Sequence, residues 1–162
     1  MQVEIVRSPR RRKTVQAERR GRTVVVRLPV GLTRSEERRW VETMVERLER
    51  RERLERLNAS RDLERRAVEL NDRYFRGRLR WRSIRYVRAS RWQFASCTPQ
   101  DRTIRVSEKV AEYPGWVRDY VLVHELAHLR IPGHTRRFWE LVNRYPLAER
   151  ARGFLAALGQ EL

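Results

Sequence analysis

The 162-residue sequence has one cysteine, two lysines and no long apolar run. A single cysteine, Cys97, excludes an internal disulfide framework and a zinc ribbon built from several cysteines. No apolar run is longer than the five residues 154–158, and residues 120–123 are only four, which is far short of the ~18 residues that a membrane-spanning helix needs. The first residues also lack the cationic and apolar regions of a secretory signal. We therefore expect a cytoplasmic protein with no membrane partner.

The formal net charge is +17, and all but two of the 38 basic residues are arginine. A strong positive field attracts phosphate, so nucleic acid and nucleotides are candidate partners. A GC-rich genome would encode the same excess of arginine over lysine whatever the function of the protein. The charge is therefore weak evidence for a particular ligand. Hydrophobic residues make up 40% of the chain, which excludes a disordered tail and is enough for one core.

The N-terminal third predicts a small sheet followed by a long helix. Alternating apolar residues and turn residues predict an antiparallel β meander within 1–32. Thr33-Arg-Ser-Glu36 matches a capping box and predicts the start of a charged helix over 33–59. The mixed charges of residues 46–56 are typical of a solvated helix with i,i+4 ion pairs, and the glutamates argue against an RNA-binding helix.

Residues 60–162 are predicted to form a metal-binding region, within one compact domain overall. Strands and helices come in separate blocks, which favours an α+β fold with small antiparallel sheets over a parallel βαβ fold. The predicted helices cover 61–75, 116–130, 135–145 and 147–159, and the predicted strands cover 82–88, 91–97 and 102–106.

All three histidines of the chain lie between residues 124 and 134. His124 and His128 are four apart, so on a helix they share one face and can bind one ion. Pro132-Gly133 ends that helix, and His134 can return to the same ion as a third ligand. Three protein ligands leave one tetrahedral position for water, which is typical of a catalytic zinc (Zn²⁺) site rather than a structural one.

Glu125 completes an HExxH motif. It is offset by about 100° from its neighbouring ligand on the helix, so it is placed to contact the zinc-bound water rather than the ion. There it would act as general base and later pass the proton to the leaving group. Glu140 is the alternative third ligand, since some zincins use a downstream glutamate. The spacing also matches the metzincin pattern by count, but Ile131 stands where that pattern requires glycine.

Two segments resemble the YgjP-like metallopeptidase domain family, zincins related to the SprT-like proteins. They are residues 119–129, Asp-Tyr-Val-Leu-Val-His-Glu-Leu-Ala-His-Leu, and residues 134–139, His-Thr-Arg-Arg-Phe-Trp. The resemblance implies a zincin-like fold with the HExxH motif on a core helix. It also implies His124, His128 and His134 as zinc ligands and Glu125 as the catalytic acid and base.

The resemblance extends to the N-terminal half, through Arg-Arg-Lys-Thr at 11–14 and the segment 22–29. It departs at residues 91–97, where family members usually carry Arg-Trp-Gly-Ser-Cys. This chain has Arg-Trp-Gln-Phe-Ala-Ser-Cys there, which is two residues longer and lacks the glycine.

These observations predict a zinc metallopeptidase in which water activated by Glu125 attacks a peptide carbonyl. Tyr113 and Arg137 are candidate stabilisers of the developing negative charge. An extended peptide or protein substrate could add to the strand at 102–108, if that strand is the sheet edge beside the metal helix. The alternatives are a zinc-dependent hydrolase of nucleotide phosphoanhydrides and a basic DNA-associated protein with secondary proteolysis.

The other reactive or aromatic side chains are interpreted as packing residues. No histidine remains to activate Cys97 if all three bind zinc. The pair Trp92 and Phe94 could line a pocket, but strand packing is the preferred interpretation. Helical spacing assigns Phe138, Leu141, Val142 and Tyr145 to the core.

Overall fold

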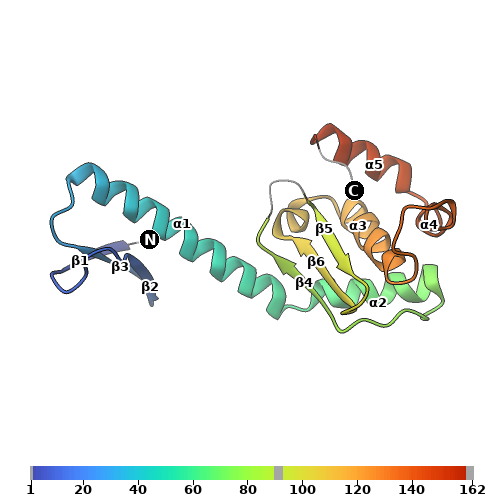
Figure 1. The fold of residues 1–162 in the computed structure, drawn as a ribbon, viewed down its shortest axis with the longest axis horizontal. Coiled ribbons are helices and arrows are strands. Elements are labelled where there is room, and N and C mark those ends of the chain that lie inside the picture. The colour runs from blue at the N-terminus through green and yellow to red at the C-terminus, as the bar shows by residue number, and fades with distance from the viewer. Residues whose placement is uncertain (1, 90–92, 160–162) are drawn as a thin grey trace. The chain divides into compact units, whose positions relative to one another are not determined.

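The computed structural model describes residues 2–89 and 93–159 (Figure 1). Strands and helices come in blocks, which confirms the α+β class. The chain divides into two compact units, Met1–Glu55 and Arg56–Leu162, whose boundary lies within helix α1 (Arg34–Ala59). The predicted segments 1–32, 33–59 and 60–162 do not coincide with these units, because the first part of α1 packs on the N-terminal sheet.

The sheet of the first unit is mixed, so the prediction of an antiparallel meander is wrong. Its strands are β1 (Gln2–Ser8), β2 (Gln16–Arg20) and β3 (Thr23–Pro29), in the order β1-β3-β2. β2 is antiparallel to β3, whereas β1 is parallel to it. β3 carries three consecutive buried valines, 24–26. β3 is buried on both faces and is therefore the central strand. Because β2 pairs with one edge of β3, β1 pairs with the other edge.

Helix α1 begins with the predicted capping box. The Glu36 carboxylate accepts the backbone N–H of Thr33 at 2.8 Å, and the Thr33 hydroxyl accepts the N–H of Glu36 at 3.3 Å. Two ion pairs, Arg7 with Glu37 and Arg19 with Glu52, join strands to the helix. The core beneath it consists of Val24, Val26, Leu28 and Leu48, with Val15, Ala17, Leu32, Trp40, Val41, Met44 and Val45 packed around them.

The second unit contains the predicted helices and strands to within a few residues. Its elements are α2 (Asp62–Phe75), β4 (Ser83–Val87), β5 (Ala95–Thr98), β6 (Thr103–Ser107), the 3₁₀ helix η1 (Glu108–Glu112), α3 (Gly115–His128), α4 (Arg136–Val142) and α5 (Ala148–Ala157). No sequence pattern predicted η1. Residues 90–92, which include Trp92 and part of the strand expected at 91–97, lie outside the described residues.

The second sheet has the order β4-β6-β5. β4 is parallel to β6 and β5 is antiparallel to it, so this sheet is also mixed rather than antiparallel. The central strand is β6, which carries the buried side chains of Ile104 and Val106. The expectation that the strand at 102–108 forms the edge is therefore wrong, and β5 is an edge strand instead.

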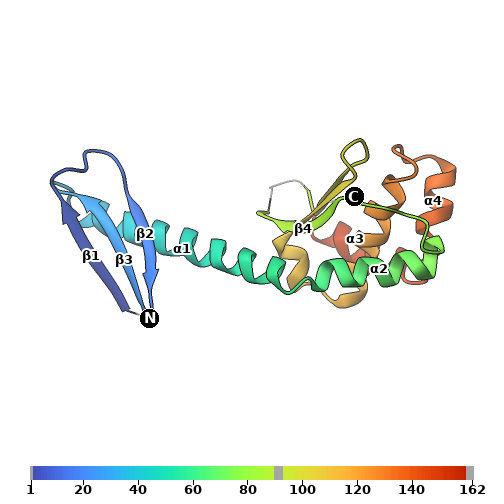
Figure 2. The same ribbon diagram turned by 90° about the horizontal axis from the view of Figure 1, so that it is seen from below.

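Helix α3 is the core helix of the second unit and packs against α2, α4, α5 and strand β5. Figure 2 shows α3 beside α2 and α4. Its residues from Asp119 to Ala127 are all buried, which holds the HExxH segment rigidly. Arg66 of α2 makes a bidentate ion pair with the buried carboxylate of Asp119, with N–O distances of 2.7 and 2.8 Å. In the described part of the chain, no helix combines the length and the apolarity needed to cross a bilayer.

Candidate metal centre

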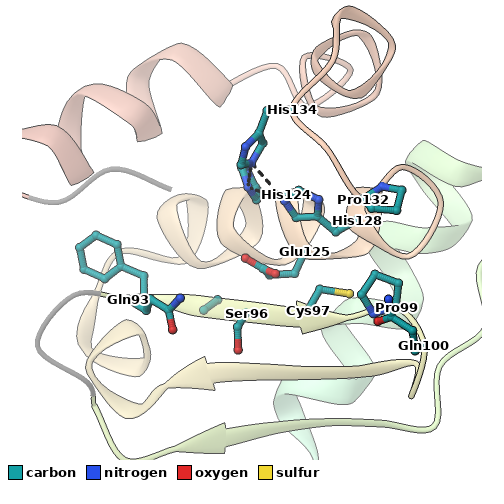
Figure 3. A pocket seen from close by; sticks show the side chains of 12 residues that line it. Gln93, Ser96, Cys97, Pro99, Gln100, His124, Glu125, His128, Pro132 and His134 are labelled. Atoms are coloured by element: carbon teal, nitrogen blue, oxygen red, sulfur yellow. Dashed lines mark hydrogen bonds between the residues drawn. The ribbon is translucent and has the colours of Figure 1, made fainter.

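The three histidines converge on one point through their Nε2 atoms (Figure 3). The Nε2–Nε2 distances are 3.2 Å from His124 to His128, 3.1 Å from His128 to His134 and 3.1 Å from His134 to His124. Nitrogens bound tetrahedrally at ~2.0–2.1 Å from zinc lie about 3.3 Å apart. The donor set and its spacing therefore fit a zinc ion.

Local structure positions each ring. His124 and His128 lie one turn apart on α3, which ends at His128. His134 comes from the short loop that follows and directly precedes Thr135, the N-cap of α4. His128 Nδ1 lies 3.1 Å from the carbonyl oxygen of Ile131, which can only accept a hydrogen bond. The proton is therefore on Nδ1, and the Nε2 lone pair faces the shared centre.

Aromatic rings from α4 hold the three imidazoles in place. Phe138, with 0% of its surface exposed, stacks on His128 at a centroid distance of 4.4 Å. The same ring meets His134 at 4.8 Å and His124 at 4.9 Å in edge contacts. Trp139 stacks on His134 at 5.5 Å. The prediction that Phe138 is a core residue is confirmed, but its contact with every member of the histidine cluster was not foreseen.

Burial favours the neutral form of His124 and His128. It lowers the pKa of His124 to about 3, with smaller contributions from the charges of His128, His134 and Arg152. Burial also lowers the pKa of His128. Because a protonated imidazole cannot bind a metal, these directions favour the ligand form at neutral pH.

Glu125 reaches from α3 toward β5 and is 3% exposed (Figure 3). Its burial raises the pKa of the carboxyl group to about 8. Cys97 of β5 shares this environment, and its pKa rises to about 12 through burial and, to a smaller extent, the charge of Glu125. A protonated thiol is a poor nucleophile, which agrees with the interpretation of Cys97 as a packing residue.

The histidines and Glu125 line a cleft with a cavity volume of about 350 Å³. One wall is formed by α3 and the loop after it, and the other by β5 and the residues around it. The lining residues are His124, Glu125, His128, Pro132 and His134 on the first wall and Gln93, Phe94, Ala95, Ser96, Cys97, Pro99 and Gln100 on the second. Phe94, for which strand packing was the preferred interpretation, is buried and also lines the cleft. The rest of this second wall was not predicted, because residues 91–97 depart from the family pattern.

The remaining candidates lie apart from the histidine cluster. Glu140 is exposed and pairs with Arg136 at 3.2 Å. Arg137 is exposed, and neither it nor Tyr113 is among the residues that line the cleft. Tyr113 packs edge to face on Phe94, at 5.7 Å between centroids, and reaches the cleft only through that ring. The role of Tyr113 and Arg137 in stabilising negative charge stays a prediction.

Comparison with known proteins agrees with this geometry. A model of the YgjP-like metallopeptidase domain matches residues 52–156. Among solved structures, the metallopeptidase zymogen of Pyrococcus abyssi abylysin is similar, with a TM-score of 0.52 and 20% sequence identity. That match covers 62% of this chain and 98% of the other, and it supports the fold. A search of curated proteins finds no match to the sequence.

Proposed function

Because this chain belongs to the YgjP-like metallopeptidase family, we propose that it is a zinc-dependent peptidase with Glu125 as its general base. His124, His128 and His134 would hold the ion. The observation that carries the proposal is the convergence of three imidazole nitrogens, 3.1–3.2 Å apart, in a cleft that also contains a buried carboxylate.

The donor set suits zinc more than the hard cations magnesium and calcium. All three donors are imidazole nitrogens, whereas magnesium and calcium prefer oxygen ligands. When bound, zinc supplies a Lewis acid that polarises a carbonyl and lowers the pKa of a coordinated water. The hydrogen bond from His128 to the Ile131 carbonyl keeps one lone pair aimed at the centre, so little reorganisation is needed for binding.

Glu125 is suited to proton transfer rather than to binding the ion. Its carboxylate is not part of the histidine cluster and reaches toward β5, where the attacking water and the substrate carbonyl would meet. As general base it takes a proton from the attacking water, and as general acid it returns that proton to the departing amine. Its burial keeps bulk water from competing for this proton.

The cleft suits an extended polypeptide. In the described part of the sheet, β5 pairs with β6 on one side only, so its other edge offers backbone N–H and C=O groups to a ligand. A peptide strand can add to such an edge and place its carbonyl groups beside the metal helix. This supports a peptide substrate over a nucleotide, for which the positive net charge is the main argument.

The test compares Glu125→Gln with His128→Ala on casein and on a peptide library. The glutamine variant should keep about one zinc per chain and lose activity by ~10² or more, the usual contribution of general base catalysis. The alanine variant should lose most of its zinc, measured by elemental analysis. Glu140→Gln is the matched control, because Glu140 is exposed, and it should retain both zinc and activity.

Two results would contradict the proposal. Full peptidase activity in Glu125→Gln would remove its role as base, and loss of zinc in Glu140→Gln would restore the alternative ligand. Parallel assays on nucleoside triphosphates and on DNA-bound protein test the two alternative functions with the same variants.

A further inference from the structure

The second unit has another hollow, of about 350 Å³, which we call the arginine hollow. Four of its six lining residues are arginines from three separate segments, and all four are exposed. None of the described lining residues is acidic. The lining consists of Arg78, Leu79, Arg80, Arg102, Leu129 and Arg130.

The four arginines are available to a ligand. Other arginines of this unit, such as Arg66 and Arg136, form ion pairs with carboxylates. Within the described residues, none of the four in the hollow has a carboxylate partner. Arg80 instead donates hydrogen bonds to the carbonyl oxygens of Gly77 at 2.6 Å and Leu79 at 2.9 Å.

The backbone that carries these arginines is fixed. The buried side chain of Asn71 holds both the N–H and the C=O of Leu79, each at 3.2 Å. Arg102 lies in the turn between β5 and β6 with a φ of 52°, a left-handed conformation that is unfavourable for a non-glycine residue. Its carbonyl oxygen accepts the N–H of Arg82 at 2.7 Å, which holds the turn in this conformation.

The arginine hollow and the metal cleft are lined by neighbouring residues on two stretches of chain. At the end of α3, His128 lines the cleft and Arg130 lines the hollow. In the β5–β6 turn, Gln100 lines the cleft and Arg102 lines the hollow. On both stretches the residues that line the cleft and the hollow are two positions apart, so an extended peptide that leaves the metal centre on this side would pass the arginines within a few residues.

We propose that the arginine hollow binds an acidic segment of the polypeptide substrate and so sets a preference for carboxylate side chains on one side of the cleaved bond. The inference rests on the proposed peptidase function. Guanidinium groups bind carboxylates through paired hydrogen bonds, and four of them around one hollow favour more than one acidic residue. The described lining has no aromatic ring on which a nucleic-acid base could stack, which favours a peptide over a single-stranded nucleic acid.

The first arm of the test measures cleavage by the zinc-loaded full-length chain. A neutral peptide that the enzyme cleaves is remade with glutamate in place of glutamine, one position at a time on both sides of the bond. Glutamate within a few residues of the bond on one side should raise kcat/KM by about 3- to 30-fold, from two partly exposed ion pairs. This ratio should fall to near one in Arg102→Gln/Arg130→Gln.

The matched control is Arg85→Gln/Arg105→Gln. These two arginines are neighbours on β4 and β6, are exposed, and lie outside both the cleft and the arginine hollow. The control removes the same net charge and should keep the glutamate-to-glutamine ratio of the unmodified chain. If the control loses the ratio as fully as the hollow variant, the preference comes from the overall charge and the inference is wrong.

The second arm measures binding and does not depend on turnover. Zinc-loaded Glu125→Gln is titrated into a labelled glutamate-rich peptide, followed by fluorescence anisotropy. Adding the Arg102 and Arg130 substitutions should weaken binding by about 3- to 30-fold, while adding the control pair should not. Because binding is measured without turnover, this arm tests the inference even if no peptide is cleaved. Absence of cleavage would overturn the proposed function, not the inference.

Three outcomes would overturn the inference. The first is a glutamate-to-glutamine ratio near one in an enzyme that cleaves the neutral peptide. The second is peptide binding that responds equally to the hollow pair and the control pair. The third is a single-stranded DNA oligonucleotide whose binding depends on the hollow pair while peptide binding does not.

Discussion

Replacing Phe138 by leucine would loosen all three of the proposed zinc ligands at once. The ring is fully buried and lies within 4.4–4.9 Å of each imidazole, measured between centroids. Leucine has three fewer side-chain carbons, and at about 0.8 kcal/mol per buried carbon the variant should lose about 2 kcal/mol of unfolding free energy. For a unit of this size the melting temperature of the zinc-free protein should fall by roughly 8 °C.

The informative comparison is with Phe75→Leu. Phe75 is 2% exposed and belongs to α2, and none of its described ring contacts is with a histidine. Both variants should lose similar stability without zinc. Only Phe138→Leu should also lose zinc affinity, by about tenfold, because the rings lose the support that orients them. Competition against a chromophoric chelator measures this affinity, and equal zinc affinity in the two variants would refute the reasoning.

Two further predictions concern the loss of stability and of zinc at low pH and the ion pair between α2 and α3. A histidine whose pKa is lowered in the folded protein favours folding above the unfolded value of ~6.5, and this contribution is lost as the pH falls toward the folded value, which is about 3 for His124. The zinc-free protein should therefore lose stability between these values, and zinc should be released below about pH 5–6, as dialysis followed by elemental analysis would reveal. Retention of zinc at pH 4 would mean that other residues bind it. Asp119→Asn should lower the unfolding free energy by about 2 kcal/mol, because Asp119 is 7% exposed and Arg66 would keep a charge without its partner. Chemical denaturation measures this change, and an unchanged midpoint at the same slope would contradict it.

The features that the sequence predicted correctly depend on short-range spacing. The capping box at Thr33 and Glu36 involves residues three apart, and the helical pair His124 and His128 involves residues four apart. Helix geometry alone fixes both distances. The return of His134 to the same centre also follows from a short loop whose turn residues could be recognised.

The features that it missed depend on which segments become neighbours. Alternation of apolar residues indicates which face of a strand is buried, but it does not indicate which strand lies beside it. This is why the sequence did not reveal that β1 pairs in parallel with β3 or that β6 is a central strand. β5 was harder still, because its four residues are all partly buried and show no alternation. The ion pair of Arg66 with Asp119 joins residues 53 positions apart and left no local signal.

The three histidines come from one short segment, whereas the wall beside Glu125 comes from a distant one, and this difference affects the order in which the enzyme assembles. The three histidines close loops of only four and six residues, so gathering them costs little chain entropy. The β5 wall that shields Glu125 comes from a segment almost thirty residues earlier and requires the sheet to form. With the metal and the base that we propose, we expect a nascent chain to bind zinc before Glu125 is buried, so that hydrolytic activity develops only when folding is complete.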